Sequence, residues 1–201
     1  GSPAYRADVG VANGRIAAIG ELKTAPAGTV IDAAGKYVTP GFIDIHRHAD
    51  AAVFRPGFGE LELKQGLTTI VNGNCGLSVT PCRSTYQKEI RAYLTPITGA
   101  LPEDKDFSSL ATYLKAAEAE PRRINTAMLT GSGTIRACAA GFGVPELDRV
   151  QLKTVHELLE QELAAGALGV SLGLGYAPDC FYSTEELIEA LRPLTNSGIP
   201  I

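Results

Sequence analysis

The chain has 201 residues and a formal net charge of −4, so it lacks the excess of basic residues that would indicate a nucleic-acid partner. No apolar run approaches the roughly 18 residues of a membrane span, and no charged-then-apolar leader is present in these residues. The four cysteines show no Cys-x-x-Cys spacing, which favours free thiols over a disulfide framework. We therefore expect a soluble, cytoplasmic protein.

The first 37 residues alternate apolar and polar side chains between turn signals, which predicts short antiparallel strands. The dipeptide Asn13-Gly14 predicts a hairpin that joins strands at residues 7–11 and 15–19. This segment, residues 1–37, is expected to form part of a small β-domain.

From residue 38 onward, predicted strands and helices alternate, which requires a parallel sheet in an α/β fold. The expected strands are one that ends at His46, then residues 68–71, 125–130 and 167–172, and a last one that begins at residue 198. The expected helices lie around residues 59–64, 86–94, 107–117 and 145–165, and after Ser183, where Ser183 and Glu186 fit a capping box.

The most informative motif is a pair of histidines at the end of the first of these strands. Side chains two residues apart share one face of a strand, so His46 and His48 can converge on one metal ion while Arg47 points to the other face. The alternative is that two surface histidines decorate the end of a strand.

Three segments resemble a known family. Residues 40–48, Pro-Gly-Phe-Ile-Asp-Ile-His-Arg-His, resemble the first barrel strand of the amidohydrolase superfamily of metal-dependent hydrolases. Residues 65–78, which contain Gly-Asn-Cys-Gly, and residues 166–178 are similar to the second and fourth strands of its N-acyl-D-amino-acid deacylase (D-aminoacylase) branch.

The resemblance implies a distorted (β/α)8 TIM barrel, which takes roughly 250 residues when complete. Residues 38–201 would then be the first half of the barrel, and residues 1–37 part of a small β-sandwich domain. We expect the chain to be truncated at both ends.

In the D-aminoacylase branch that the chain resembles, the cysteine at the position of Cys75 is a metal ligand. With His46 and His48 it would hold one or two zinc ions, and a soft thiolate suits zinc. The fourth strand, residues 169–173, lacks the lysine that bridges two metals in hydantoinase-like and dihydroorotase-like relatives, so Cys75 is the natural substitute. The alternative for Cys75 is a buried structural thiol.

The implied activity is metal-assisted hydrolysis of the amide bond of N-acyl-D-amino acids, which yields a carboxylate and a free D-amino acid. No general base is identified within this chain, because the resemblance places the catalytic aspartate, and two further histidine ligands, beyond residue 201. Tyr176 occupies the position of a substrate-binding tyrosine, although a tyrosine packed by its ring is the alternative. Hydrolysis of cyclic amides and a non-catalytic half-barrel are the competing functions.

Four further residues are weaker candidates. Asn74 and Ser78 could supply hydrogen bonds around the metal centre. Ser132 stands where the family commonly has a histidine, which indicates a different substrate preference. Arg136 could bind a carboxylate, although a structural ion pair is the preferred interpretation. His156 is expected on a solvated helix face and is not a candidate ligand.

Overall fold

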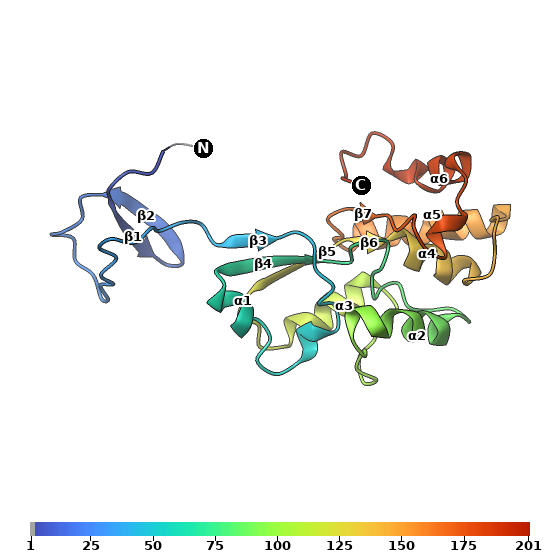
Figure 1. The fold of residues 1–201 in the computed structure, drawn as a ribbon, viewed down its shortest axis with the longest axis horizontal. Coiled ribbons are helices and arrows are strands. Elements are labelled where there is room, and N and C mark those ends of the chain that lie inside the picture. The colour runs from blue at the N-terminus through green and yellow to red at the C-terminus, as the bar shows by residue number, and fades with distance from the viewer. Residues whose placement is uncertain (1–2) are drawn as a thin grey trace. The chain divides into compact units, whose positions relative to one another are not determined.

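The computed structural model describes residues 3–201, which divide into two compact units at the peptide bond after Pro40. In the first unit, β1 (Asp8–Ala12) and β2 (Arg15–Gly20) form the expected antiparallel hairpin (Figure 1). Asn13 and Gly14 between them have φ angles of 52° and 72°, as the tight turn of a two-residue hairpin requires. Residues 21–40 contain no further strand, so the expectation of several antiparallel strands holds for the hairpin alone.

The second unit, Gly41–Ile201, contains parallel strands that pair in chain order. They are β3 (Phe42–Asp44), β4 (Leu67–Asn72), β5 (Asn125–Met128), β6 (Thr130–Gly131) and β7 (Val170–Ser171). β3, β4 and β5 form one sheet and β6 and β7 another, and the N–H of Leu129, between β5 and β6, donates to the carbonyl of Asn72 at 2.9 Å. At the last edge, the N–H of Val170 donates to the carbonyl of Pro200 at 3.0 Å, where a further strand is expected to begin.

Helices connect these strands, so the prediction of a mixed α/β fold is confirmed. They are α1 (Glu60–Lys64), α2 (Gln87–Thr98), α3 (Leu110–Glu118), α4 (Ser132–Ala140), α5 (Arg149–Ala164) and α6 (Thr184–Ala190). α4 and α5 pack on each other and on β6 (Figure 1). Between residues 3 and 201, no helix is both long and apolar enough to cross a membrane.

Capping side chains decide where two helices begin. α3 begins at Leu110 and not at Phe107, because Ser109 accepts a hydrogen bond from the N–H of Thr112. α5 begins after Asp148, whose carboxylate accepts from the N–H groups of the first turn, so the prediction of a helix from residue 145 was four residues too early.

The capping box predicted for α6 is only half present. The hydroxyl of Ser183 accepts from the N–H of Glu186 at 3.1 Å, as expected. The carboxylate of Glu186, however, accepts from the N–H of Leu147 at 2.6 Å and does not return to Ser183. A contact between segments distant in the sequence replaces the local one.

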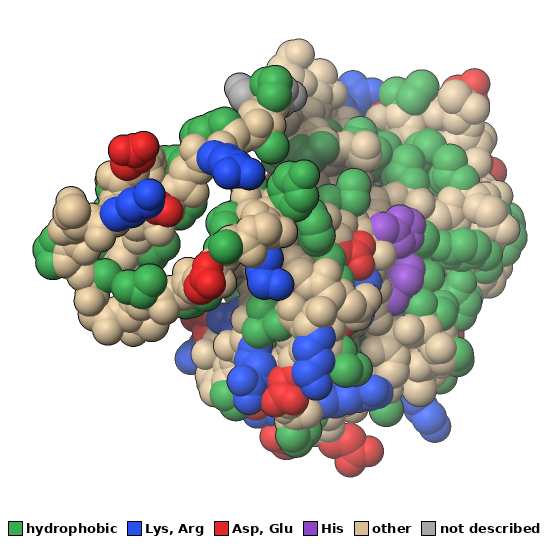
Figure 2. Space-filling model, turned by 60° about the vertical axis from the view of Figure 1, so that its left-hand side comes forward, with side chains coloured by type: hydrophobic (Ala, Val, Ile, Leu, Met, Phe, Trp, Pro, Cys, Tyr) green, Lys and Arg blue, Asp and Glu red, His purple; other side chains and the backbone are tan. Residues whose placement is uncertain are grey.

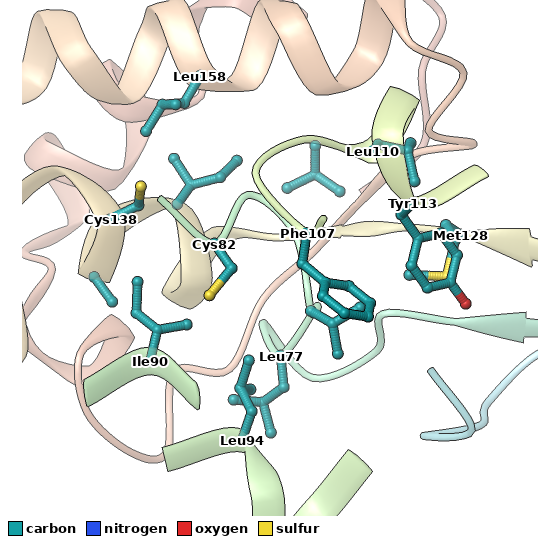
Figure 3. Close-up of a cluster of buried hydrophobic side chains, with 14 of the residues drawn as sticks. Leu77, Cys82, Ile90, Leu94, Phe107, Leu110, Tyr113, Met128, Cys138 and Leu158 are labelled. Carbon is teal, nitrogen blue, oxygen red and sulfur yellow. The ribbon is translucent and has the colours of Figure 1, made fainter. Parts of the chain in front are cut away.

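The core of the second unit lies between the sheet and the helices (Figure 3). Phe107, just before α3, is 1% exposed, and its ring lies 5.6 Å from that of Phe54 and 6.1 Å from that of Tyr113. Leu77 and Val79, from the loop after β4, are also buried in this cluster. The core therefore anchors the loop that follows β4.

One carboxylate lies inside this core. Glu162 on α5 is 1% exposed, and its oxygens accept from the hydroxyl of Thr80 at 2.8 Å and from the N–H of Leu110 at 3.0 and 3.1 Å. Burial raises the pKa of Glu162, and the hydrogen bonds from Leu110 and Thr80 offset only part of the rise. Glu162 thus links α5 to the first residue of α3.

Replacing Glu162 by glutamine should weaken the dependence of stability on pH. Because the folded-state pKa is raised, the folded protein binds a proton that the unfolded chain has released, so the free energy of unfolding should fall as pH rises above the ordinary pKa of glutamate. Urea unfolding from about pH 4 to about pH 8 measures this slope. In Glu162→Gln the free energy of unfolding should fall less over this pH range. Glu160→Gln should leave the fall unchanged, because Glu160 is exposed on the same helix. Equal slopes in the wild type and Glu162→Gln would contradict the assignment.

Candidate metal centre

His46 and His48 lie just after β3, which ends two residues before His46 and is thus shorter than predicted. Pairing with β4 nevertheless continues, because the N–H of Arg47 donates to the carbonyl of Val71 at 3.1 Å. The side chain of Arg47 donates to Glu62 at 2.9 Å, so it contacts α1 while the two histidines approach each other. Side chains therefore continue to alternate between the two faces past the end of the strand, as the sequence predicts.

Two buried asparagines join the histidine segment to the end of β4. Asn72 accepts from the N–H of Ala49 at 3.0 Å. The amide of Asn74 donates to the carbonyls of Arg47 at 3.2 Å and Val71 at 2.9 Å. Asn74 therefore has a positioning role, because it fixes the backbone around both histidines relative to the segment that carries Cys75.

Cys75 has an unusual backbone conformation. Its φ is 59°, in the left-handed region that few residues other than glycine adopt, and φ is also positive at Gly73 and Gly76. The N–H of Gly76 donates to the hydroxyl of Ser171 at 2.9 Å, and the hydroxyl of Tyr176 donates to the carbonyl of Cys75. Contacts from the segment around and after β7 thus hold the turn at Cys75.

The side chains of His46, His48 and Cys75 converge. One ligand atom from each lies within 4.8 Å of the others, and Nε2 of His46 is 3.2 Å from Sγ of Cys75. The two imidazole rings are 5.7 Å apart and nearly perpendicular, at 78°. Figure 2 shows two neighbouring histidine side chains reaching the surface beside hydrophobic ones. The three residues that the sequence singles out as ligands are therefore brought together at an accessible position.

The charge state of this cluster suits a metal ion. Burial, and then the neighbouring His46, lower the pKa of His48, which favours the neutral imidazole that binds metals. Nδ1 of His48 is buried and has no hydrogen-bond partner among residues 3–201. A bound cation would compensate for this unsatisfied polar group.

Tyr176, the predicted substrate-binding residue, lies beside Cys75. Its hydroxyl donates to the carbonyl of Cys75, and its side chain is 38% exposed. Burial, together with Cys75, raises the pKa of Tyr176 to about 12, so the phenol stays protonated at neutral pH. The hydroxyl is thus a hydrogen-bond donor within the cluster.

Two of the weaker candidates have structural contacts outside the cluster. Ser78 donates to the carbonyl of Thr80 and accepts from the N–H of Gly131 at 2.9 Å. Arg136 is fully buried in α4, where it donates to the carbonyl of Val144 at 2.8 Å. Neither side chain is directed at the cluster.

Ser132 and His156 also lie outside the cluster. The hydroxyl of Ser132 donates to the buried carboxylate of Asp179. His156 is half-buried, and its Nε2 donates to the carbonyl of Glu189 at 2.7 Å, so the expectation of a solvated face was wrong. That histidine instead packs α5 against α6, and it is not part of the metal cluster.

Sequence reasoning missed two buried carboxylates near the site, Asp179 and Asp50. Asp50 is fully buried, and burial raises its pKa to about 7, although the amides of Gly73 and Val79 oppose the rise. By distance and angle, neither oxygen of Asp50 has a hydrogen-bond partner among the described residues. An acidic residue within the run Ala-Asp-Ala-Ala, directly after the histidine pair, is the signal that could have indicated it.

Comparison with known proteins agrees with this geometry. Residues 29–132 match the model of the amidohydrolase family Amidohydro_3. The chain is 38% identical to a D-aminoacylase of Alcaligenes xylosoxydans xylosoxydans over 98% of its own length and 40% of the relative. It is also 38% identical to an N-acyl-D-glutamate deacylase of the same organism, over 89% of the chain and 35% of the relative.

Solved structures give the same result. A D-aminoacylase studied for its binuclear metal centre superposes with a TM-score of 0.83 at 36% identity, over 98% of this chain and 40% of that one. An N-acyl-D-glutamate deacylase from Bordetella bronchiseptica, complexed with zinc and a phosphonate inhibitor, superposes with a TM-score of 0.79 at 33% identity, again over 98% and 40%. The chain thus spans 35–40% of the length of these four proteins. It belongs to the amidohydrolase family, in the D-aminoacylase branch.

Proposed function

We propose that the full-length protein is a zinc-dependent hydrolase that cleaves the amide bond of N-acyl-D-amino acids to a carboxylate and a free D-amino acid. The observation that carries this proposal is the convergence of His46, His48 and Cys75 within 4.8 Å. The relatives with D-aminoacylase and D-deacylase activity in their names support the substrate class.

The donor set fits zinc. Two imidazoles and one thiolate are ligands that zinc prefers. Binding would keep Cys75 deprotonated at neutral pH. One or two ions are compatible with this set, and the zinc complex of the Bordetella relative supports the choice of metal.

Zinc in this position would supply an acidified water and polarise the amide carbonyl. The chain's own residues would bind and orient: His46, His48 and Cys75 hold the ion, and Tyr176 offers a protonated hydroxyl. That hydroxyl now donates to the backbone of Cys75 and would turn to an oxygen of the substrate. We place the general-base aspartate and the two further histidine ligands in sequence beyond residue 201.

The proposal includes the wider fold. Residues 38–201 would form the first half of a TIM barrel, which puts the ends of β3 and β4, and thus the cluster, at the carboxyl face where barrel enzymes bind substrate. The β1–β2 hairpin would belong to a small β-sandwich. Four free cysteines support a reducing compartment, so we place the protein in the cytoplasm.

Removal of metal tests this function in the full-length protein. A chelator should abolish hydrolysis of N-acetyl-D-methionine, zinc should restore it, and N-acetyl-L-methionine should not be cleaved at any stage. Elemental analysis should find zinc in the active protein. His156→Ala, which lies outside the cluster, should keep both zinc and activity, whereas His48→Ala should lose both. Full activity without metal, or equal cleavage of both enantiomers, would refute the proposal.

A further inference from the structure

The N-terminal end of α4 packs closely on the turn that carries Cys75. The N–H of Thr134 donates to the carbonyl of Gly76 at 3.1 Å. A Cβ atom on Gly131 would lie only 2.4 Å from the carbonyl carbon and oxygen of Gly76, so the two backbones are in direct contact. Movement at this end of α4 would therefore displace the residue next to Cys75.

The carboxylate of Asp179 lies at this junction. Asp179 opens the 3-10 helix Asp179–Phe181 and is 1% exposed. Its Oδ2 accepts from the hydroxyl of Ser132, the first residue of α4, and from the N–H of Gly173 at 2.8 Å. A Cβ atom on Gly76 would lie 2.6 Å from the same oxygen. Asp179 therefore joins the segments that follow β4, β6 and β7.

The segment that Asp179 holds touches Cys75 itself. A Cβ atom on Gly173 would lie 2.3 Å from the carbonyl oxygen of Cys75, and Tyr176, three residues further on, donates its hydroxyl to that oxygen. The strained φ of 59° at Cys75 requires such external support, because a non-glycine residue does not adopt it freely. Contacts that run through Gly173 and Gly76 thus connect Asp179 to the peptide unit that follows Cys75.

One carboxylate oxygen of Asp179 is left without a partner among the described residues. Its Oδ1 is buried and has no hydrogen-bond partner among residues 3–201, and burial raises the pKa of this carboxyl. A buried carboxylate with one unsatisfied oxygen costs stability. Ser132, Gly173 and the charge of Arg136 oppose this rise in pKa, so the carboxylate is tied to the junction of the three segments mainly through Ser132 and Gly173.

We propose that Asp179, together with Ser132, is a positioning residue that sets the place of the Cys75 thiolate relative to His46 and His48. This inference rests on the proposed metal centre. Asp179 contacts neither the metal nor the substrate; it acts through the backbone of residues 75–76 and 173. Its loss should displace the sulfur ligand while leaving the two histidines in place.

Cobalt(II) in the full-length protein reports on this position, because a thiolate ligand gives a charge-transfer absorption that histidine does not. In Asp179→Asn this band should weaken, and affinity for cobalt should fall about 10-fold to 100-fold, as for loss of other groups that orient ligands. Ser132→Ala should have a smaller effect of the same kind. Because Ser132 acts through its hydrogen bond to Asp179, the double variant should be no worse than Asp179→Asn alone.

Glu162→Gln is the matched control. Glu162 is equally buried and hydrogen-bonded, but it contacts Thr80 and Leu110 and not the turn at residues 73–76. It should leave the cobalt band and affinity unchanged even where stability falls. An unchanged band and affinity in both Asp179→Asn and Ser132→Ala would overturn the inference. If the wild-type protein showed no such band, or if Cys75→Ala did not remove it, the metal centre on which the inference depends would be refuted instead.

Discussion

Replacing Cys75 by alanine in the full-length protein should lower its affinity for zinc by more than about 100-fold. Loss of a group that only orients a ligand costs up to about 100-fold, and loss of a ligand itself should cost more. The reason is that Sγ of Cys75 lies 3.2 Å from Nε2 of His46, so the variant would remove one of three converging donors. Hydrolysis of N-acetyl-D-methionine should be lost with the metal. Zinc content by elemental analysis, with the rate on the same samples, measures both effects.

Cys180→Ala is the matched control for this prediction. Cys180 is an exposed free thiol outside the cluster, so its loss should change neither zinc content nor rate. Cys75→Ser should behave like Cys75→Ala in metal binding, because a hydroxyl is a much poorer zinc ligand than a thiolate. Zinc content equal to that of the wild type in Cys75→Ala would mean that the cysteine is structural.

The cysteines of this chain differ in their surroundings, which bears on whether each is a structural thiol or a metal ligand. Cys82 and Cys138 are buried in the core, and burial raises the pKa of Cys82, as expected for structural thiols. Cys75 is only half-buried and lies against an imidazole. A structural role thus fits Cys82 and Cys138, whereas the surroundings of Cys75 support the proposed role as a ligand.

The sequence predicts well what depends on neighbouring residues. The β1–β2 hairpin follows from Asn13-Gly14, whose backbone angles are a local property. The convergence of His46 and His48 follows from alternation along an extended segment, which persists beyond the hydrogen-bonded strand. The parallel order of the strands follows from the alternation of strands and helices.

Features that depend on distant partners were not predictable in this way. Helix α4 begins Ser-Gly-Thr, a sequence typical of a turn, and it forms because its first residues contact Gly76 and Asp179 from other segments. The hydrogen bond between Asp179 and Ser132 could not be predicted either, since the two residues lie 47 positions apart in the sequence. For Arg136 the predicted structural ion pair is confirmed, but its partners could not be named, because they lie on a loop and on α6.

Arg136 is a guanidinium buried completely within the second unit. Its two terminal nitrogens donate to the carbonyls of Val144 at 2.8 Å and Pro145 at 3.3 Å, and one lies 3.7 Å from the carboxylate of Glu186. The ring of Tyr182 lies 4.7 Å from the guanidinium carbon. A planar cation with several donors satisfies all of these groups at once, which a smaller or apolar side chain cannot do.

Replacing Arg136 by methionine should therefore lower the free energy of unfolding by about 3 to 5 kcal/mol, the range for breaking a buried ion pair by removing one partner. The two carbonyls would stay buried without their donor, and Glu186 would lose its positively charged partner. Arg136→Lys should recover only part of the loss, because one ammonium cannot reach both carbonyls in the geometry of the guanidinium fork. Urea unfolding followed by circular dichroism measures these differences.

The control is Arg192→Met, which removes an exposed arginine paired with Glu189 three residues earlier. An exposed pair contributes little, so that variant should stay within about 1 kcal/mol of the wild type. If Arg136→Met were equally mild, the buried pair would be exchangeable for an apolar side chain, and the junction of α4 with α6 would depend on packing alone. A large loss for Arg136→Met alone would show that the charge itself holds this junction, and with it the end of α4 that contacts the turn at Cys75.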